Sequence, residues 1–252
     1  GAPFWMILAG LMGMASKFTE CTLGVKYRNE FEDGHVSGGP MYYLTKGFAE
    51  RGLPGGGILA VLFSIFCILG SLGGGNMFQA NQAHQALTGV LGDFPGFVTG
   101  LIFAGIVFIV IVGGLKSIAS VTEKVVPLMA VIYVGTALII LIMNADMIGW
   151  AFGQIFAGAF TGLGVAGGMV GALIQGFKRA AFSNEAGVGS AAIAHSAVRT
   201  KEPITEGFVS LLEPFIDTVV ICTMTALVIV ISGVLNVDPE TGLYIWNAAA
   251  GR

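Results

Sequence analysis

The sequence predicts an all-α polytopic membrane protein with about six transmembrane helices, and three observations support this fold class. Hydrophobic residues make up 55% of the 252-residue chain and charged residues only 11%, against about 25% charged residues in an average soluble domain. The mean hydropathy is +0.84, and the 39 glycines suit helices that pack closely in lipid. Among the connections between the apolar segments, only alternate ones contain basic residues.

Six apolar segments are long enough to cross ~30 Å of hydrocarbon, which takes about 20 helical residues. They are residues 3–25, 57–88, 97–114, 125–143, 166–198 and 207–233. The second is long enough to extend past the membrane, and the fifth is interrupted by polar residues and glycines. Residues 147–168 are apolar but contain several glycines, so we expect an interfacial or re-entrant helix there.

The distribution of lysine and arginine predicts the orientation, because basic residues are retained on the cytoplasmic side in short loops. Residues 26–56, 115–124 and 199–205 contain eight basic residues: Lys26, Arg28, Lys46, Arg51, Lys116, Lys124, Arg199 and Lys201. The opposite connections contain none and include Asp93, Asp146, Asp238 and Glu240. We therefore expect the three basic loops to be cytoplasmic and the N-terminus of the chain to lie outside.

The most unusual motif is FSNEAGVGS at residues 182–190, which is polar and glycine-rich within an apolar segment. Two glycines and several side chains that compete for backbone hydrogen bonds disfavour a continuous helix here. Unwound backbone in a membrane needs protein or a water-filled cavity to satisfy it, and broken helices bind substrates and ions in secondary transporters. The motif therefore predicts a substrate or ion site. The alternative is a cytoplasmic loop after a helix that ends near Arg179.

A second polar motif, GGGNMFQANQ, lies at residues 73–82 in the long second segment. Asn76 and Gln79 are three residues apart and so share a helix face. Amides in lipid either join helices through hydrogen bonds or line a polar site. Both roles stay open, and Gln79 is the preferred site member because neutral amides suit a zwitterionic ligand.

Two carboxylates lie inside the last apolar segment, Glu213 and Asp217, at i and i+4 with Pro214 between them. Ionisable groups within a span are candidates for cation coordination or proton relay. Alternatively, they are protonated or are neutralised by Lys178 or Arg179.

The remaining charged and titratable residues of the apolar segments can be explained by structural roles, although Lys178 and Arg179 also have a functional alternative. Lys178 and Arg179 either face a cavity with Glu185, Glu213 or Asp217 as counter-charges, or anchor a helix end. Lys17 and Glu20, at i and i+3, resemble a paired anchor at the inner end of a helix. His84 and His195 lie near segment ends, where solvated or internally bonded histidines are expected rather than ligands.

The sequence offers no sign of an enzyme. It has no nucleotide loop, nucleophile elbow or zinc spacing, and the glycine-rich residues 34–39 lack the Lys-Ser/Thr ending of a phosphate-binding loop. Cys21, Cys67 and Cys222 lie in apolar runs and read as small buried hydrophobes. We assign no metal, no cofactor and no nucleic-acid partner.

Five motifs, in order, resemble the alanine or glycine:cation symporters. They are the opening GAPFWM, GMASKFTE at residues 13–20, GPMYYL at 39–44, NMFQAN at 76–81 and SNEAGVGSA at 183–191. The resemblance implies the inverted-repeat bundle of the bacterial leucine transporter, with two broken helices beside the substrate. Residues 184–187 would be the second-repeat counterpart of a Gly-Asn-x-Ala-Gly stretch in the family's first helix. The sequence departs from the family pattern at residues 73–75 and 7–8.

The resemblance implies sodium-coupled symport of a small neutral amino acid, alanine or glycine, into the cell across the plasma (inner) membrane of a prokaryote. Rival functions are a channel and a membrane-embedded scaffold. We expect residues 1–252 to form a single transmembrane domain that is incomplete at both ends, without the first helix and the C-terminal helices. The expected partners are the amino acid, Na⁺ as coupling ion and membrane lipid.

The broken helix would bind the substrate through its backbone groups, with Asn184 and Gln79 fixing orientation and Phe182 forming an apolar wall. The expected substrate-binding residues are Gln79, Asn76, Phe182, Ser183, Asn184, Gly187, Gly189 and Ser190. The candidates for ion coupling or gating are Glu185, Arg179, Glu213 and Asp217.

Overall fold

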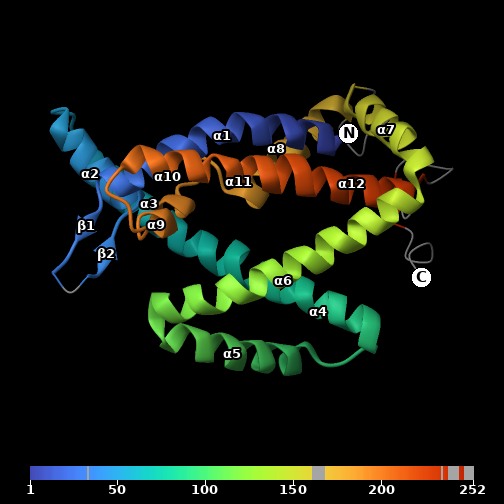
Figure 1. Cartoon of the computed structure of the whole chain (residues 1–252), viewed down its shortest axis with the longest axis horizontal. Helices are drawn as coiled ribbons and strands as arrows, with labels where there is room; N and C mark the ends of the chain where they lie inside the picture. Colours follow the sequence, from blue (N-terminus) through green and yellow to red (C-terminus); the bar gives the residue numbers. More distant parts are fainter. Residues whose placement is uncertain (33, 161–167, 234, 238–243, 247–252) are drawn as a thin grey trace. The chain divides into compact units, whose positions relative to one another are not determined.

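The protein is almost entirely helical, which confirms the all-α fold class (Figure 1). The computed structural model describes residues 1–32, 34–160, 168–233, 235–237 and 244–246. Within these residues the only strands form two short antiparallel hairpins. One pairs β1 (Asn29–Glu30) with β2 (Val36–Ser37), and the other pairs β3 (Leu235–Val237) with β4 (Tyr244–Trp246).

The helices follow one another closely along the chain. From the N-terminus they are α1 (Ala2–Lys26), α2 (Pro40–Glu50), α3 (Gly56–Gly70), η1 (Ser71–Met77), α4 (Phe78–Leu91), α5 (Gly96–Val112) and α6 (Gly114–Met143). There follow η2 (Ala145–Met147), α7 (Ile148–Phe160), α8 (Gly168–Asn184), α9 (Ser190–His195), α10 (Pro203–Ser210), α11 (Leu212–Pro214), η3 (Phe215–Ile221) and α12 (Cys222–Ile231). η1 and η3 are π-helical, and η2 is a 3₁₀ turn.

The chain divides into two compact units. The first comprises Gly1–Ala60 and Thr136–Arg252, and the second comprises Val61–Gly135. The expectation of a single transmembrane domain over residues 1–252 stays a prediction.

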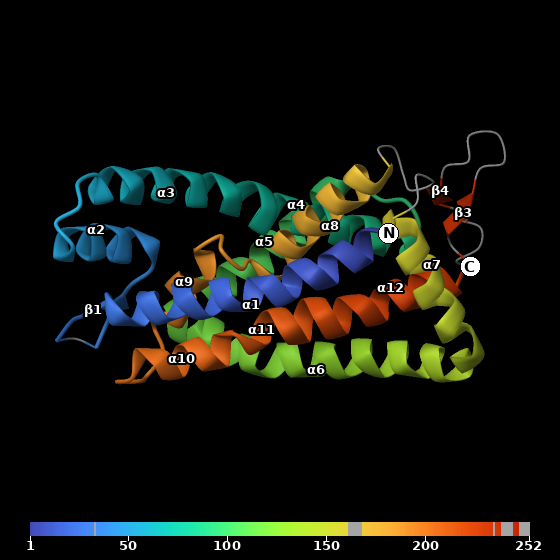
Figure 2. The same cartoon turned by 90° about the horizontal axis from the view of Figure 1, so that it is seen from above.

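Helix α1 is the central element of the first unit. It packs against α8 and α10 and also contacts α9 and η3 (Figures 1 and 2). The contacts are made by small residues. A Cβ atom on Gly207 of α10 would lie only 2.2 Å from Thr22 Oγ1 of α1, and Ala192 and Ser210 are completely buried. Small residues at helix contacts let the backbones approach closely, which is how helices associate where lipid offers no hydrophobic driving force.

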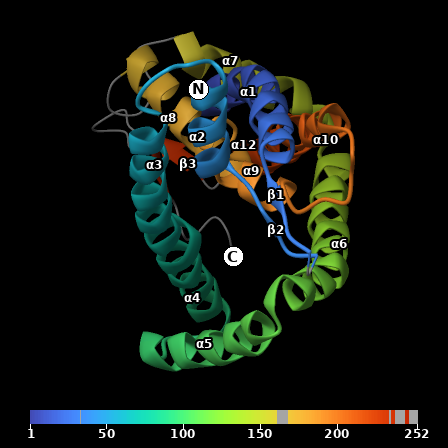
Figure 3. The ribbon, with the colours of Figure 1, turned by 90° about the vertical axis from the view of Figure 1, so that its left-hand side faces the viewer.

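Helices α3, η1 and α4 form one continuous helix, which belongs to the second unit from Val61 on (Figure 3). The π-helical segment η1 coincides with the glycines at residues 73–75. Glycine has no Cβ and weakly supports the regular helix, so a π-bulge is tolerated there. Helix α5 packs against α4, and His84 Nδ1 lies 2.9 Å from Thr99 Oγ1 between them. His84 is thus an internally bonded histidine, as expected.

Three of the described helices are long and apolar enough to cross a membrane: Gly56–Leu91, Lys116–Met143 and Pro203–Ile231. They correspond to the predicted spans 57–88, 125–143 and 207–233. The shorter apolar helix Gly96–Val112 matches a fourth, and α1 and α8 overlap the other two. The count of six spans stays a prediction.

Helix α7 lies within residues 147–168, where we expect an interfacial or re-entrant helix. Part of that stretch, residues 161–167, lies outside the described residues. Asp238 and Glu240 of the expected outer connection also lie outside them.

The expectation of a loop at residues 115–124 is wrong, because α6 begins at Gly114 and continues to Met143. No glycine or proline occurs between Gly114 and Pro127. The lysines and glutamate in this stretch are good helix formers, so their charge signals a position near a membrane surface without ending the helix. The side of the membrane stays a prediction.

Polar groups of α2 bond the residues that follow α1. Lys46 of α2 donates hydrogen bonds to the Tyr27 carbonyl, at 2.9 Å, and to Asn29 Oδ1, at 2.5 Å. The Tyr27 hydroxyl donates to Glu50 and holds the pKa of that exposed carboxyl below its ordinary value, and Lys26 acts in the same direction. Helix α2 begins at Pro40, directly after Gly39.

Candidate substrate and ion site

The polar motif at residues 182–190 interrupts the helix, as the sequence predicts. Helix α8 ends at Asn184 and α9 begins at Ser190. Between them, Glu185 has φ 53° and Gly187 and Gly189 have φ 81° and 88°. This left-handed backbone costs glycine nothing, but it costs another residue roughly 1–2 kcal/mol. The alternative in which the helix ends near Arg179 is wrong, since α8 continues past it.

Two charged residues of α1 hold the two ends of this break. Lys17 Nζ donates to the Asn184 carbonyl at 3.0 Å, at the end of α8. Glu20 accepts hydrogen bonds from Gly187 N–H at 3.3 Å and from Gly189 N–H at 2.9 Å. Lys17 is only 3% exposed and Glu20 only 6%. The expected role as a helix-end anchor is wrong, because both side chains turn inward and replace hydrogen bonds that the broken helix lacks.

Two further hydrogen bonds lie within the break, and one joins it to η3. Ala186 N–H donates to Asn184 Oδ1 at 3.0 Å, and Val188 N–H donates to the Glu185 carbonyl at 3.1 Å. The Asn184 amide also donates to Thr218 Oγ1 of η3 at 2.8 Å. Asn184 is therefore bonded on both sides within the chain, which ties the break to the neighbouring helix.

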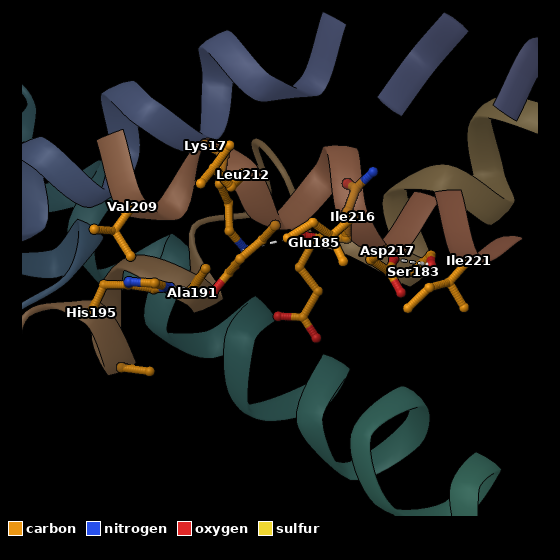
Figure 4. Close-up of a pocket in the computed structure, with 13 residues that line it drawn as sticks. Lys17, Ser183, Glu185, Ala191, His195, Val209, Leu212, Ile216, Asp217 and Ile221 are labelled. Carbon is orange, nitrogen blue, oxygen red and sulfur yellow. Dashed lines mark hydrogen bonds and ion pairs between the residues drawn. The ribbon is translucent and has the colours of Figure 1, made fainter. Parts of the chain in front are cut away.

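A cavity of about 650 Å³ opens beside the break. Its lining comes from α1, α8, α9 and the helix that runs from α10 to η3. The lining residues are Lys17, Ser183, Asn184, Glu185, Ala191, Ala194, His195, Val209, Leu212, Glu213, Ile216, Asp217 and Ile221. Ser183 and Asp217 lie together at one end and His195 lies at the other (Figure 4). The cavity thus has two separate polar ends.

At the first end, Asp217 is surrounded by hydroxyl groups. Ser183 Oγ donates to Asp217 Oδ2, and Thr218 Oγ1 donates to the same oxygen at 3.1 Å. Cys222 Sγ lies 3.4 Å from Ser183 Oγ. Asp217 makes no ion pair within the described residues. A carboxylate with oxygen neighbours and no basic partner can accept a cation.

At the second end, Glu213 is already neutralised. Its Oε2 lies 2.8 Å from Lys17 Nζ and its Oε1 lies 2.9 Å from His195 Nε2. The alternative in which Lys178 or Arg179 neutralises Glu213 is wrong, because both are exposed on α8 and form no ion pair with any described residue. Two carboxylates one helical turn apart therefore have different surroundings. Pro214 separates them and leads directly into the π-helix η3.

The remaining predicted site residues are placed as follows. Ser190 Oγ donates to Glu185 Oε2 at 2.5 Å, which bridges the ends of the break. Phe182 is exposed on α8. Asn76 and Gln79 are exposed residues of the second unit. Their roles in binding stay predictions.

The residues of this region that were not predicted as part of the site include Lys17, Glu20, Thr218 and His195. The first two carried a signal, because two charges in an apolar span at one-turn spacing require partners. Thr218 carried none beyond its position next to Asp217.

The comparison with known families decides the identity of the chain. The Sodium:alanine symporter family matches residues 1–252, the whole sequence. The chain belongs to the sodium:alanine symporter family. By its description the family comprises symporters, which are transporters and not enzymes.

Individual members of the sodium:alanine symporter family are similar over nearly the full chain. Sodium/alanine symporter AgcS of Methanococcus maripaludis is 44% identical over 234 residues, which cover 92% of this chain and 51% of AgcS. Amino-acid carrier protein AlsT of Bacillus subtilis is 37% identical over 99% of this chain and 52% of AlsT. The protein named probable sodium/glutamine symporter GlnT, also of Bacillus subtilis, is 35% identical over 99% of this chain and 51% of its own length. The chain therefore spans about half the length of these relatives.

Proposed function

We propose that the full-length protein is a sodium-coupled symporter that carries a small neutral amino acid, alanine or glycine, into the cell. The family and the names of the relatives support the transport of amino acids with sodium. The observation in this chain that carries the proposal is the carboxylate of Asp217, which lies next to a broken helix, accepts from two hydroxyl groups and forms no ion pair with any described residue. Secondary transporters place coupling ions and substrates beside such breaks.

The sodium ion would bind at the Asp217 end of the cavity. Asp217 Oδ2 accepts hydrogen bonds from the hydroxyl groups of Ser183 and Thr218. Carboxylate and hydroxyl oxygens of this kind are suitable ligands for Na⁺. A carboxylate at membrane depth without a counter-charge is costly, so a bound cation would stabilise this arrangement. Further oxygen ligands would come from the other half of the full-length protein.

The amino acid would also lie at the Asp217 end of the cavity, beside the break. Glu20 takes the Gly187 and Gly189 N–H groups in this structure, so these two donors are not free for a substrate carboxylate. Ser183, Glu185 and Asp217 present oxygen atoms to the cavity. This end therefore suits the ammonium group of a zwitterion, and the substrate carboxylate would be bound by groups outside these residues, with Gln79 as our candidate.

Size selectivity would not come from this cavity alone. Its volume of about 650 Å³ far exceeds that of alanine, and an apolar pocket distinguishes one methylene by only about 1–3 kcal/mol. We assign the closure of the site to the remaining half of the protein, through the relative rocking of helix bundles by which such transporters alternate access. Glutamine, which the name of one relative gives as its substrate, is the second candidate substrate.

The test is uptake of labelled alanine into proteoliposomes by the full-length protein, measured against sodium concentration. Loss of one charged ligand is worth about 1.5–3 kcal/mol, so Asp217→Asn should raise the sodium concentration for half-maximal uptake by roughly 10- to 150-fold. Asp146→Asn is the matched control, since Asp146 is exposed in η2. An unchanged sodium dependence in Asp217→Asn would remove Asp217 from the ion site. Stronger competition by glutamine than by glycine would reassign the substrate.

A further inference from the structure

His195, the last residue of α9, contacts a carboxylate oxygen with each of its ring nitrogens. Nδ1 lies 2.5 Å from Glu206 Oε1 of α10, and Nε2 lies 2.9 Å from Glu213 Oε1 of α11. The His195 side chain is 15% exposed, at the end of the cavity away from Asp217 (Figure 4). One imidazole therefore connects α9 with both of the following helices.

The geometry determines how many protons this cluster holds. An ionised carboxylate only accepts hydrogen bonds, and a neutral imidazole donates from one nitrogen only. With a neutral ring and two ionised carboxylates, one nitrogen lone pair would face a carboxylate oxygen within hydrogen-bond distance. Both contacts become hydrogen bonds only when the cluster carries one further proton.

The surrounding charges place that proton on the ring. The second oxygen of Glu213 accepts from Lys17 Nζ at 2.8 Å, which favours the ionised form of Glu213. Glu206 is only 7% exposed. With an imidazolium at His195, two positive groups balance these two carboxylates. Without it, the largely buried carboxylate of Glu206 has no positive partner among the described residues, which is unfavourable away from water.

The other titratable groups near the cluster do not supply the missing positive charge. On α1 they are Lys17, already counted, Glu20, a carboxylate that bonds the break, and Cys21, a thiol that is neutral near pH 7. On α2 the nearest is Tyr43, which is neutral and lies near Glu20. Glu20 adds negative charge and so strengthens the preference for a protonated His195.

We propose that His195, Glu206 and Glu213 form a proton-binding site that fastens α9 to α10 and α11. Helix α9 starts directly after the break, so the bound proton stabilises the position of residues that lead out of the site. This site is separate from the Ser183 and Asp217 end of the cavity, and the proposal does not depend on which amino acid is carried. Because the contacts require the proton, they are complete at low pH and are lost as the pH rises through the titration of the cluster.

Proton binding is measured directly by NMR titration of the full-length protein with isotope-labelled histidine, with the His195 signal assigned from its absence in His195→Gln. We expect a doubly protonated ring near neutral pH. Glu206→Gln should lower the titration midpoint by about 1–3 pH units, because it removes a carboxylate in contact with the ring. A neutral His195 ring across about pH 5 to 8, or a midpoint unchanged in Glu206→Gln, would overturn the proposal.

Transport gives a second readout. Gln at position 195 keeps a donor but does not titrate, so His195→Gln should remove the part of the pH profile of uptake that wild type shows between about pH 5 and 8. His84→Gln is the matched control, because the His84 ring contacts a threonine hydroxyl and the Phe94 ring and forms no ion pair with any described residue. A His195→Gln profile identical to wild type would contradict the link to transport. A protein that failed to take up alanine would still give the NMR titration, so the two proposals fail separately.

Discussion

Replacing Glu20 with glutamine should weaken the hydrogen bonds that hold the break at residues 185–189, while a side chain of the same shape stays in position. Glu20 is 6% exposed on α1 and accepts from Gly187 and Gly189, the latter at 2.9 Å. Gln has the same shape but no charge, and only one of its two terminal atoms accepts a hydrogen bond. The second backbone N–H would therefore face an amide NH₂ group.

The magnitude follows from those two bonds. A hydrogen bond to a charged group contributes about 1.5–3 kcal/mol and a neutral one about 0.5–1.5 kcal/mol. Losing the longer bond and weakening the shorter one, less the relief of burying a charge, gives a net loss of about 2–3 kcal/mol. Local opening of the break should become roughly 30- to 150-fold more frequent.

Hydrogen exchange measured by mass spectrometry on peptides that cover residues 181–190 tests this. Glu20→Gln should accelerate exchange of the break amides by the factor above, while peptides from the second unit, Val61–Gly135, remain unchanged. Glu123→Gln, an exposed carboxylate of α6, is the matched control. Exchange at the break that is the same in Glu20→Gln and wild type would show that α1 does not hold the break, and would refute the reasoning.

Two further predictions concern the packing of α1 against α10 and the hydrogen bonds that order residues 196–200. Gly207→Ala places a Cβ atom 2.2 Å from a side-chain oxygen of α1, so it should lower the free energy of unfolding in detergent by about 1–3 kcal/mol. Gly57 has open space around it, so Gly57→Ala should leave this free energy unchanged. Equal losses in the two variants would contradict the packing account. Arg28 donates to three carbonyls within residues 196–200, at 2.6–3.0 Å, so Arg28→Ala should speed tryptic cleavage in this segment and Arg51→Ala should not. Unchanged cleavage in Arg28→Ala would show that these bonds do not order the segment.

The sequence predicted the break because its chemistry is local. Glycines and hydrogen-bonding side chains at residues 182–190 act on their own backbone, so their effect can be read without knowing the neighbours. The pairing of Lys17 and Glu20 could not be read in this way. Their spacing places them on one helix face, but it does not say that this face lies against the ends of α8 and α9.

The ends of the helices near charged residues, and the partners of those residues, also could not be predicted from the sequence. Lys116 and Lys124 indicated a polar connection, yet polar residues also extend a helix beyond the membrane when no breaker follows, as α6 does. One of the two alternatives for Arg179 gave it Glu185, Glu213 or Asp217 as a counter-charge. Arg179 lies on an exposed face of α8 instead, and the partners of Glu213 come from α1 and α9.

The most direct test of the account is the uptake of labelled alanine by the full-length protein in sealed proteoliposomes with an imposed sodium gradient. The account predicts accumulation of alanine above its external concentration with inward sodium, and collapse of that accumulation when the gradient is dissipated or sodium is replaced by potassium. Uptake that only equilibrates alanine, or that proceeds equally well without sodium, would contradict it.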